Sequence, residues 1–139
     1  MHNKTLSYLH LPPGADLPAL ALPPFTAILV ADTDVDELWM FDAARWLVAC
    51  GCRYLLAWGA DCEAWRDAID DAALEAHDYD VPDESKVLST SHEDEDLEEV
   101  FWFARHRAAH PHALLDAVLI LHIAEQPARE RMMAAYAQA

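Results

Sequence analysis

Carboxylate side chains follow the apolar segments of this 139-residue chain at several points. The apolar segment FTAILVA, residues 25–31, is followed by Asp32 and Asp34. Carboxylate oxygens are ligands that Mg²⁺ prefers, and a magnesium ion held in this way can activate a phosphate substrate. The same acids suit the start of a helix, where free N–H groups and the helix dipole favour negative charge. Helix capping, with Asp34 and Glu37 as a capping box, is the favoured interpretation, and a Mg²⁺ site at Asp32 and Asp34 is the alternative.

The segment Asp32-Thr33-Asp34-Val35, which follows an apolar run, resembles the first motif of haloacid-dehalogenase-type phosphatases. The resemblance implies that Asp32 is a nucleophile and Asp34 a general acid/base, both beside Mg²⁺, and that Ser91 supplies the hydroxyl of the second motif. The chain departs from the family pattern, because an acidic residue follows the motif and no lysine stands in a catalytic setting. The acidic pair expected after a late strand is replaced by HIAEQ.

The charge of the chain is strongly unbalanced, with 25 acidic residues against 9 lysines and arginines and a formal net charge of −16. Residues 61–99 contain 16 of the acids against only Arg66 and Lys86, so this stretch holds −14 of the total. Such a field repels nucleic-acid phosphates and anionic membranes, and it attracts basic proteins or cations. We therefore expect a basic protein partner, and neither direct nucleic-acid binding nor a membrane partner.

In size, charge and lack of catalytic motifs, the chain resembles the small acidic immunity proteins of bacterial toxin systems such as contact-dependent growth inhibition. The resemblance implies a non-enzymatic inhibitor that covers a basic, nuclease-type toxin with carboxylates in place of phosphates. Two acidic runs are the predicted partner-binding residues. They are Asp67, Asp70, Asp71 and Glu75 in one run, and Glu93, Asp94, Glu95, Asp96, Glu98 and Glu99 in the other.

Motifs for cofactors and covalent catalysis are missing from the sequence. The three glycines, Gly14, Gly51 and Gly59, are too few for a dinucleotide-binding or a Walker A loop, which need several glycines close together. No G-x-S-x-G elbow is present. We expect no cofactor and no enzymatic activity, with Mg²⁺ as the cofactor of the alternative reading.

Histidines and cysteines give weaker signals. His106, His110 and His112 could bind zinc, but a solvated helix end, where cationic side chains suit the dipole, is the favoured interpretation. His122 lies inside an apolar run and is expected to be a hydrogen-bonded core histidine. The three cysteines are an odd number without CxxC spacing, which is typical of reduced thiols in a cytoplasm. With no secretory signal and no membrane-spanning apolar run, the sequence predicts a cytoplasmic protein.

Five tryptophans leave two interpretations open. They are Trp39, Trp46, Trp58, Trp65 and Trp102. Aromatic rings beside acids can anchor a basic protein partner, and large rings can equally cover a small core.

The elements that must position these residues alternate between strand and helix. Strands are predicted at 25–31, 54–58, 86–90 and 117–124. The continuous apolar runs at 25–31 and 117–124 are typical of buried strands, with 25–31 buried on both faces. Helices are expected to follow each strand, beginning near Asp34, Asp61, Asp94 and Pro127. Five prolines in residues 1–24 predict an N-terminal arm before a single domain at 25–139.

This alternation predicts a small three-layer α/β sandwich, Rossmann-like or flavodoxin-like, with a mainly parallel sheet. The sheet has four strands, or five if residues 5–11 add an edge strand. Ligands in such sheets bind beyond the carboxyl ends of the strands. The predicted positions there are Asp32, Asp34, Asp61, residues 91–94 and Glu125.

Overall fold

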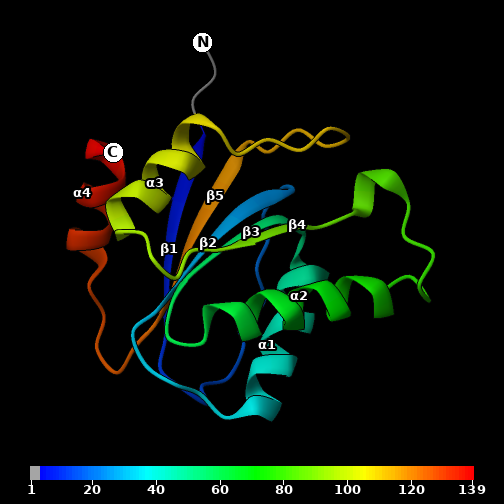
Figure 1. The fold of residues 1–139 in the computed structure, drawn as a ribbon, viewed down its shortest axis with the longest axis horizontal. Coiled ribbons are helices and arrows are strands. Elements are labelled where there is room, and N and C mark those ends of the chain that lie inside the picture. Colours follow the sequence, from blue (N-terminus) through cyan, green and yellow to red (C-terminus); the bar gives the residue numbers. More distant parts are fainter. Residues whose placement is uncertain (1–3) are drawn as a thin grey trace.

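The computed structural model describes residues 4–139, which form a five-stranded sheet in which all neighbouring strands are parallel. The strand order is β1-β5-β2-β3-β4 (Figure 1). The strands are β1 (Thr5–Leu11), β2 (Phe25–Ala31), β3 (Cys52–Gly59), β4 (Leu88–Ser91) and β5 (Ala117–Ile123).

Four α-helices cover the two faces of this sheet. They are α1 (Glu37–Cys50), α2 (Cys62–Glu75), α3 (Leu97–His106) and α4 (Arg129–Gln138), and a short 3₁₀ turn lies at Asp83–Ser85. Residues alternate along β2, so Ala27 and Leu29 pack with α1 and α2, whereas Ile28 and Val30 pack with α3. The predicted three-layer α/β sandwich is therefore confirmed, with the optional fifth strand present as β1.

Two of the three interior strands, β2 and β5, are apolar throughout because both of their faces are covered. Every residue of β2 and β5 is buried, His122 included. Burying a leucine or isoleucine side chain contributes about 1.5–3 kcal/mol, so these two strands supply a large part of the core energy. An uninterrupted apolar run is what a parallel strand between two helix layers requires.

The Pro-rich segment between β1 and β2 packs against α1. The indole Nε1 of Trp39 donates to the carbonyl of Ala15 at 3.0 Å, and that of Trp46 donates to Pro18 at 2.6 Å. Leucines 17, 20 and 22 lie against the core on the same face. Of the residues predicted as an arm, 5–11 therefore form an edge strand and 12–24 form a packed crossover; residues 1–3 lie outside the described part of the chain.

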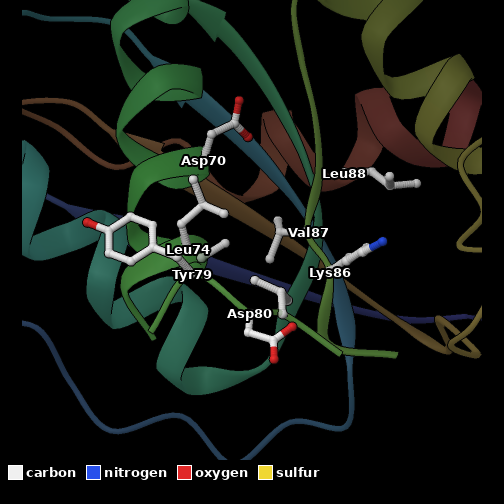
Figure 2. A pocket seen from close by; sticks show the side chains of 9 residues that line it. Asp70, Leu74, Tyr79, Asp80, Lys86, Val87 and Leu88 are labelled. Carbon is white, nitrogen blue, oxygen red and sulfur yellow. The ribbon is translucent and has the colours of Figure 1, made fainter. Parts of the chain in front are cut away.

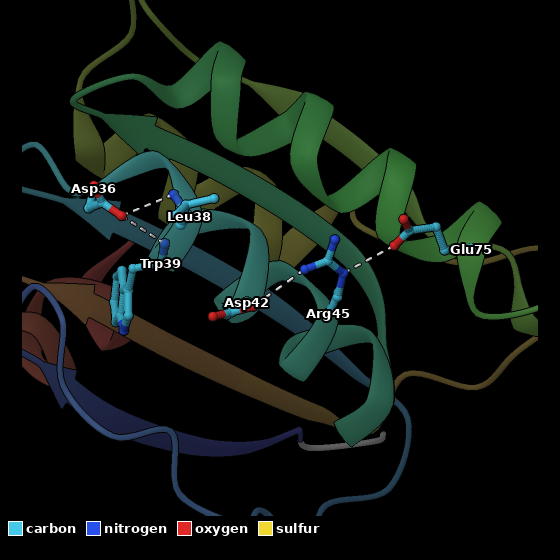
Figure 3. Close-up of polar contacts among 6 residues, drawn as sticks. All are labelled: Asp36, Leu38, Trp39, Asp42, Arg45 and Glu75. Atoms are coloured by element: carbon cyan, nitrogen blue, oxygen red, sulfur yellow. Dashed lines mark hydrogen bonds and ion pairs between the residues drawn. The ribbon is translucent and has the colours of Figure 1, made fainter.

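The start of α1 differs from the prediction by two residues. Asp36, not Asp34, is the N-cap, and its Oδ2 accepts from the backbone N–H groups of Leu38 at 3.1 Å and Trp39 at 3.4 Å (Figure 3). Asp36 has the extended backbone that a capping residue needs, and Glu37 is already helical. The predicted helix end is confirmed, because Gly51 adopts φ 108° and donates to the carbonyls of Leu47 and Val48.

Strand β3 begins earlier than predicted, at Cys52 instead of residue 54, and three other elements begin later. Strand β4 begins at Leu88 rather than residue 86, α3 begins at Leu97, and α4 begins at Arg129 instead of Pro127. Asp61 stands at the N-cap of α2 with a left-handed φ of 53°, and its side chain makes no capping hydrogen bond. Each of the three later starts falls in a polar connection, where no apolar spacing marks the boundary.

Candidate functional site

Two parts of the molecule collect the chemically active side chains. The first is the point where the strand order reverses, between the carboxyl ends of β2 and β5. After β2 the chain continues through α1 to β3, which lies on one side of β2. After β4, α3 crosses the other face of the sheet, and the chain continues to β5 on the opposite side of β2. Asp32 directly follows β2 and Glu125 lies two residues beyond β5, so both stand at the edge where such sheets bind ligands.

A chain of hydrogen bonds connects Asp32 to the edge strand. His122 Nε2 lies 2.5 Å from Asp32 Oδ2, and His122 Nδ1 lies 2.7 Å from the hydroxyl of Tyr8. The same hydroxyl accepts from the backbone N–H of Ala128 at 2.9 Å. These partners assign the proton on neutral His122 to Nε2, which donates to the carboxylate, while Tyr8 donates to Nδ1.

The buried member of this network is His122, whereas the Asp32 carboxylate is 39% exposed. His122 is 1% exposed and uses both ring nitrogens, so the prediction of a hydrogen-bonded core histidine is confirmed. His10, opposite His122 in the register of β1 and β5, lies with Nε2 2.7 Å from the carbonyl of Ala124. The arrangement joins the edge strand, the centre of the sheet and the segment before α4.

The other residues of the phosphatase-like pattern do not gather at Asp32. Asp34 is exposed in the connection to α1. Ser91 ends β4, two strands away from β2 and hence about 10 Å across the sheet, and its hydroxyl donates to Glu93 at 3.2 Å. Within residues 4–139, no group of three or more His, Cys, Asp and Glu side chains is placed to hold a metal ion.

The three histidines at the end of α3 have separate roles. His106 is exposed, whereas His110 is buried, with Nε2 2.7 Å from the carbonyl of Lys86 and Nδ1 accepting from the N–H of His112 at 3.0 Å. The expected solvated helix end is therefore wrong for His110. This residue fixes the connection after α3 against the residues that lead into β4, because it lies beyond the helix rather than on it.

The second region is the acidic surface of α2 and residues 93–99. Of the ten predicted partner-binding acids, all except Asp70 are exposed. Asp70 accepts from the hydroxyl of Ser89 at 2.6 Å, and Glu75 accepts from Arg45 Nε at 3.1 Å, which links α2 to α1 (Figure 3). Glu95 lies 3.0 Å from Nδ1 of the buried His92.

The acidic run at residues 93–99 approaches the start of α2 through Glu93 and Glu63. A side-chain hydrogen bond with Glu93 and repulsion from the same carboxylate raise the pKa of Glu63. Glu63 is exposed in the first turn of α2 and is not among the predicted partner-binding acids. Only the fold brings Glu63 beside a residue thirty positions away, so no local spacing could have revealed the pair.

A groove of about 520 Å³ lies between the end of α2 and β4 (Figure 2). Its lining residues are Asp70, Ala73, Leu74, Tyr79, Asp80, Val81, Lys86, Val87 and Leu88. The backbone at Asp78 and Tyr79 is left-handed, with φ of 51° and 67°, a conformation that L residues adopt at a cost. The signal in the sequence that points to this loop is an aromatic residue, Tyr79, between two aspartates.

Most of the tryptophans are packing residues. Trp65 is buried and meets Trp39 edge-on, and Trp58 Nε1 donates to the carbonyl of Glu95 at 2.8 Å. Trp102 is 44% exposed on α3, with the guanidinium of Arg107 over its ring. Of the two readings of the tryptophans, core packing holds for Trp39, Trp58 and Trp65.

Comparison with known proteins gives a family and no function. No curated protein and no solved structure matches the chain. Within residues 4–139, none of the helices combines the length and apolar character that crossing a membrane requires. A family model described as "Domain of unknown function (DUF7684)" matches residues 6–139, which include the edge strand and the Pro-rich crossover as well as the rest of the sheet. The chain therefore belongs to the DUF7684 family.

Proposed function

We propose that this protein is a non-enzymatic binding protein that neutralises a basic partner, in its most specific form an immunity protein for a nuclease-type toxin. The observation that carries the proposal is the exposure of nine of the ten acids in the two runs, one on α2 and one on residues 93–99. The raised pKa of Glu63 supports it, because like charges crowded together cost free energy that a cationic partner would recover.

The physical role of these acids would be steering and specificity. Exposed carboxylates attract a basic protein over a distance of about 10 Å at 0.1 M salt, and the attraction weakens as salt rises. Aligned on one helix and one connection, they can replace the phosphates that a nuclease surface binds in its substrate. Association would therefore be fast and strongly dependent on salt.

A pull-down tests this proposal. The tagged protein is recovered at about 50 mM salt from an extract of the cells that naturally produce it. The bound material is then washed with rising salt, and the eluted proteins are identified by mass spectrometry. We expect one basic protein in equal amount, released by salt, whose toxicity on expression is suppressed by co-expression of this chain. Recovery of a partner whose binding does not respond to salt, or whose expression is harmless without this chain, would contradict the proposal.

Matched charge variants locate the binding surface. Asp67→Asn with Asp71→Asn removes two charges from α2, and Asp16→Asn with Glu130→Gln removes two exposed charges elsewhere. We expect the first pair to slow association and the second pair to leave it nearly unchanged. Equal effects of the two pairs would mean that only the net charge of the chain matters.

A Mg²⁺-dependent phosphohydrolase is the second candidate, and the position of Asp32 at the reversal of strand order favours it. This reading predicts turnover of a phosphate ester with Mg²⁺ that Asp32→Asn abolishes and Asp34→Asn reduces. Because Asp32 also accepts from His122, a fall in stability without any Mg²⁺-dependent turnover would leave Asp32 a structural role only.

A further inference from the structure

Strand β4 has an open edge. It is the last strand of the sheet among residues 4–139 and pairs with β3 alone, with α2 alongside (Figure 1). The N–H of His92 donates to Ala57 of β3 at 3.0 Å. Because N–H groups alternate along a strand, those of Ser89 and Ser91 point to the open edge. An open edge is a template for another strand unless charge, a bulge or a covering element blocks it.

The groove lies beside this edge and has apolar walls. In Figure 2 the side chains of Leu74, Tyr79 and Val87 surround the hollow, and Leu88 points away from it. Leu74 is 40% exposed and Tyr79 is 72% exposed. Two large apolar side chains that remain in water around one hollow leave apolar surface for a partner to bury.

The loop that carries Tyr79 is held in a costly conformation. Consecutive left-handed residues at Asp78 and Tyr79 cost on the order of 1 kcal/mol each, and neither is glycine. The N–H of Tyr79 donates to the carbonyl of Leu74 at 2.8 Å, which fixes this turn at the end of α2. The ring gains little from burial in return, so the packing of Tyr79 in the free protein does not explain the strain.

The negative charge around the groove favours a basic occupant. Residues 70–86 contain seven acids and one lysine, a net charge of −6. Lys86 Nζ lies 3.0 Å from Asp83 Oδ1 and lowers the pKa of that carboxyl, so its charge is balanced locally. Asp70 and Asp80 line the groove itself. A second copy of this chain at the same edge would bring −6 against −6, which disfavours pairing between copies.

We propose that the groove and the open edge of β4 bind an extended basic segment of a partner protein as an added strand. The segment pairs with the backbone of Ser89 and Ser91, places an apolar side chain between Leu74 and Tyr79, and presents lysine or arginine to Asp70 and Asp80. Side chains on one face of a strand are two residues apart, so the matching pattern is basic-x-apolar-x-basic. This inference rests on the proposed function and names the surface and chemistry of the partner.

The first test uses three peptides and the full chain. The probe is the capped peptide Thr-Lys-Thr-Val-Thr-Lys-Thr; one control carries serine in place of valine, and the other is N-methylated at all of its central peptide bonds, so that neither edge of the strand can donate. Binding is followed by NMR at about 50 mM salt. We expect the probe to bind and to protect the amides of Ser89 and Ser91 from exchange, and we expect both controls to bind about tenfold more weakly. Equal binding of all three peptides would overturn the proposal.

A matched pair of variants tests the walls of the groove. Leu74→Ser with Tyr79→Ser removes its apolar side chains, and Leu38→Ser with Leu114→Ser removes two exposed leucines outside its lining, 73% and 74% exposed. We expect the groove pair to weaken peptide binding about tenfold and the control pair to leave it unchanged. Unchanged binding in the groove pair, with its fold verified by circular dichroism, would also overturn the proposal.

The partner recovered by pull-down distinguishes the two proposals. If the partner binds the groove variant normally but loses affinity for the Asp67 and Asp71 variant, the acidic-surface function stands and the groove inference is wrong. If the groove variant loses the partner and the Leu38 and Leu114 variant retains it, the groove inference is supported. If no basic partner is recovered and the probe peptide does not bind, both proposals fail.

Discussion

Two polar regions of the molecule differ in where their polar groups find partners. These regions are the reversal point between β2 and β5 and the open edge at β4. At the reversal point, the buried His122 bonds within the chain through both ring nitrogens, to Asp32 and to Tyr8. At the β4 edge, exposed acids crowd, Tyr79 remains in water, and backbone N–H groups point outward.

The difference separates stability from recognition. A polar group that is buried and fully bonded holds elements together and has little left to offer a ligand. Exposed charge of one sign, an unpaired strand edge and a strained aromatic residue each reduce the stability of the free protein or leave bonds to be made. The region that carries such costs is where we expect a partner to bind.

The largest expected effect is at the reversal point. His122→Ala should lower the free energy of unfolding by about 3 kcal/mol, because it opens a cavity in β5 and leaves Tyr8 and Asp32 without their shared partner. Urea denaturation measures this loss, and the exposed His106→Ala is the control, with a change of about 0.5 kcal/mol or less. Similar losses in the two variants would remove the distinction between the regions.

Alkaline pH should act on the buried core instead of the acidic edge. Burial raises the pKa of the Cys52 thiol to about 12 from the ordinary 9.0, so this thiol binds its proton more tightly in the folded state. Its contribution is therefore intact below pH 9 and is lost as the pH rises toward 12, by at most about 1.4 kcal/mol per unit. Between about pH 9 and pH 10, the urea midpoint should fall less in Cys52→Ala than in the natural chain. An identical slope would contradict the assignment.

At the β4 edge, a substitution should stabilise the free protein while it harms recognition. Tyr79→Gly places glycine at φ 67° and removes an exposed ring, so the free energy of unfolding should rise by up to about 1 kcal/mol. Thermal unfolding measures the gain, and the probe peptide measures the loss of binding. A marked loss of stability would show that the ring supports the fold, and the strain would then have a structural cause.

The smallest expected effect concerns the repulsion between Glu63 and Glu93. Because the pKa of Glu63 is raised in the folded state, the favourable contribution of this group is present at acid pH and is lost as the pH rises through its folded value. Glu63→Gln should therefore raise the urea midpoint at neutral pH, and the gain should vanish once both states are protonated. High salt should also reduce the gain. A rise in the urea midpoint that depends on neither pH nor salt would contradict an origin in charge repulsion.

Much of the fold was predictable because its signals are local. The apolar runs at 25–31 and 117–124 identify the interior strands β2 and β5, and Gly51 marks the end of α1 through its left-handed backbone. The cap of α1 was placed at Asp34 instead of Asp36, because several acids in a row offer equivalent capping oxygens. The role of His122 as a hydrogen-bonded core residue was also predictable, since a histidine in a buried run must find hydrogen-bond partners.

The candidate sites were less predictable, because they depend on which strands become neighbours. The acidic runs were identified from composition, but the Glu63 and Glu93 pair arises only when β4 delivers its carboxyl end beside the start of α2. The groove was not predicted, since its walls come from α2, a polar loop and β4.

The sequence by itself determined the class of fold, the buried strands and the strong negative charge of residues 61–99, because periodicity and composition are properties of the chain alone. Only the tertiary structure decided that β5 lies between β1 and β2, which joins Tyr8, His122 and Asp32. It likewise decided that β4 ends the sheet, with an open edge and a groove beside it. The physical reason is that strand order is set by packing over the whole sheet, and no local signal in the chain encodes it.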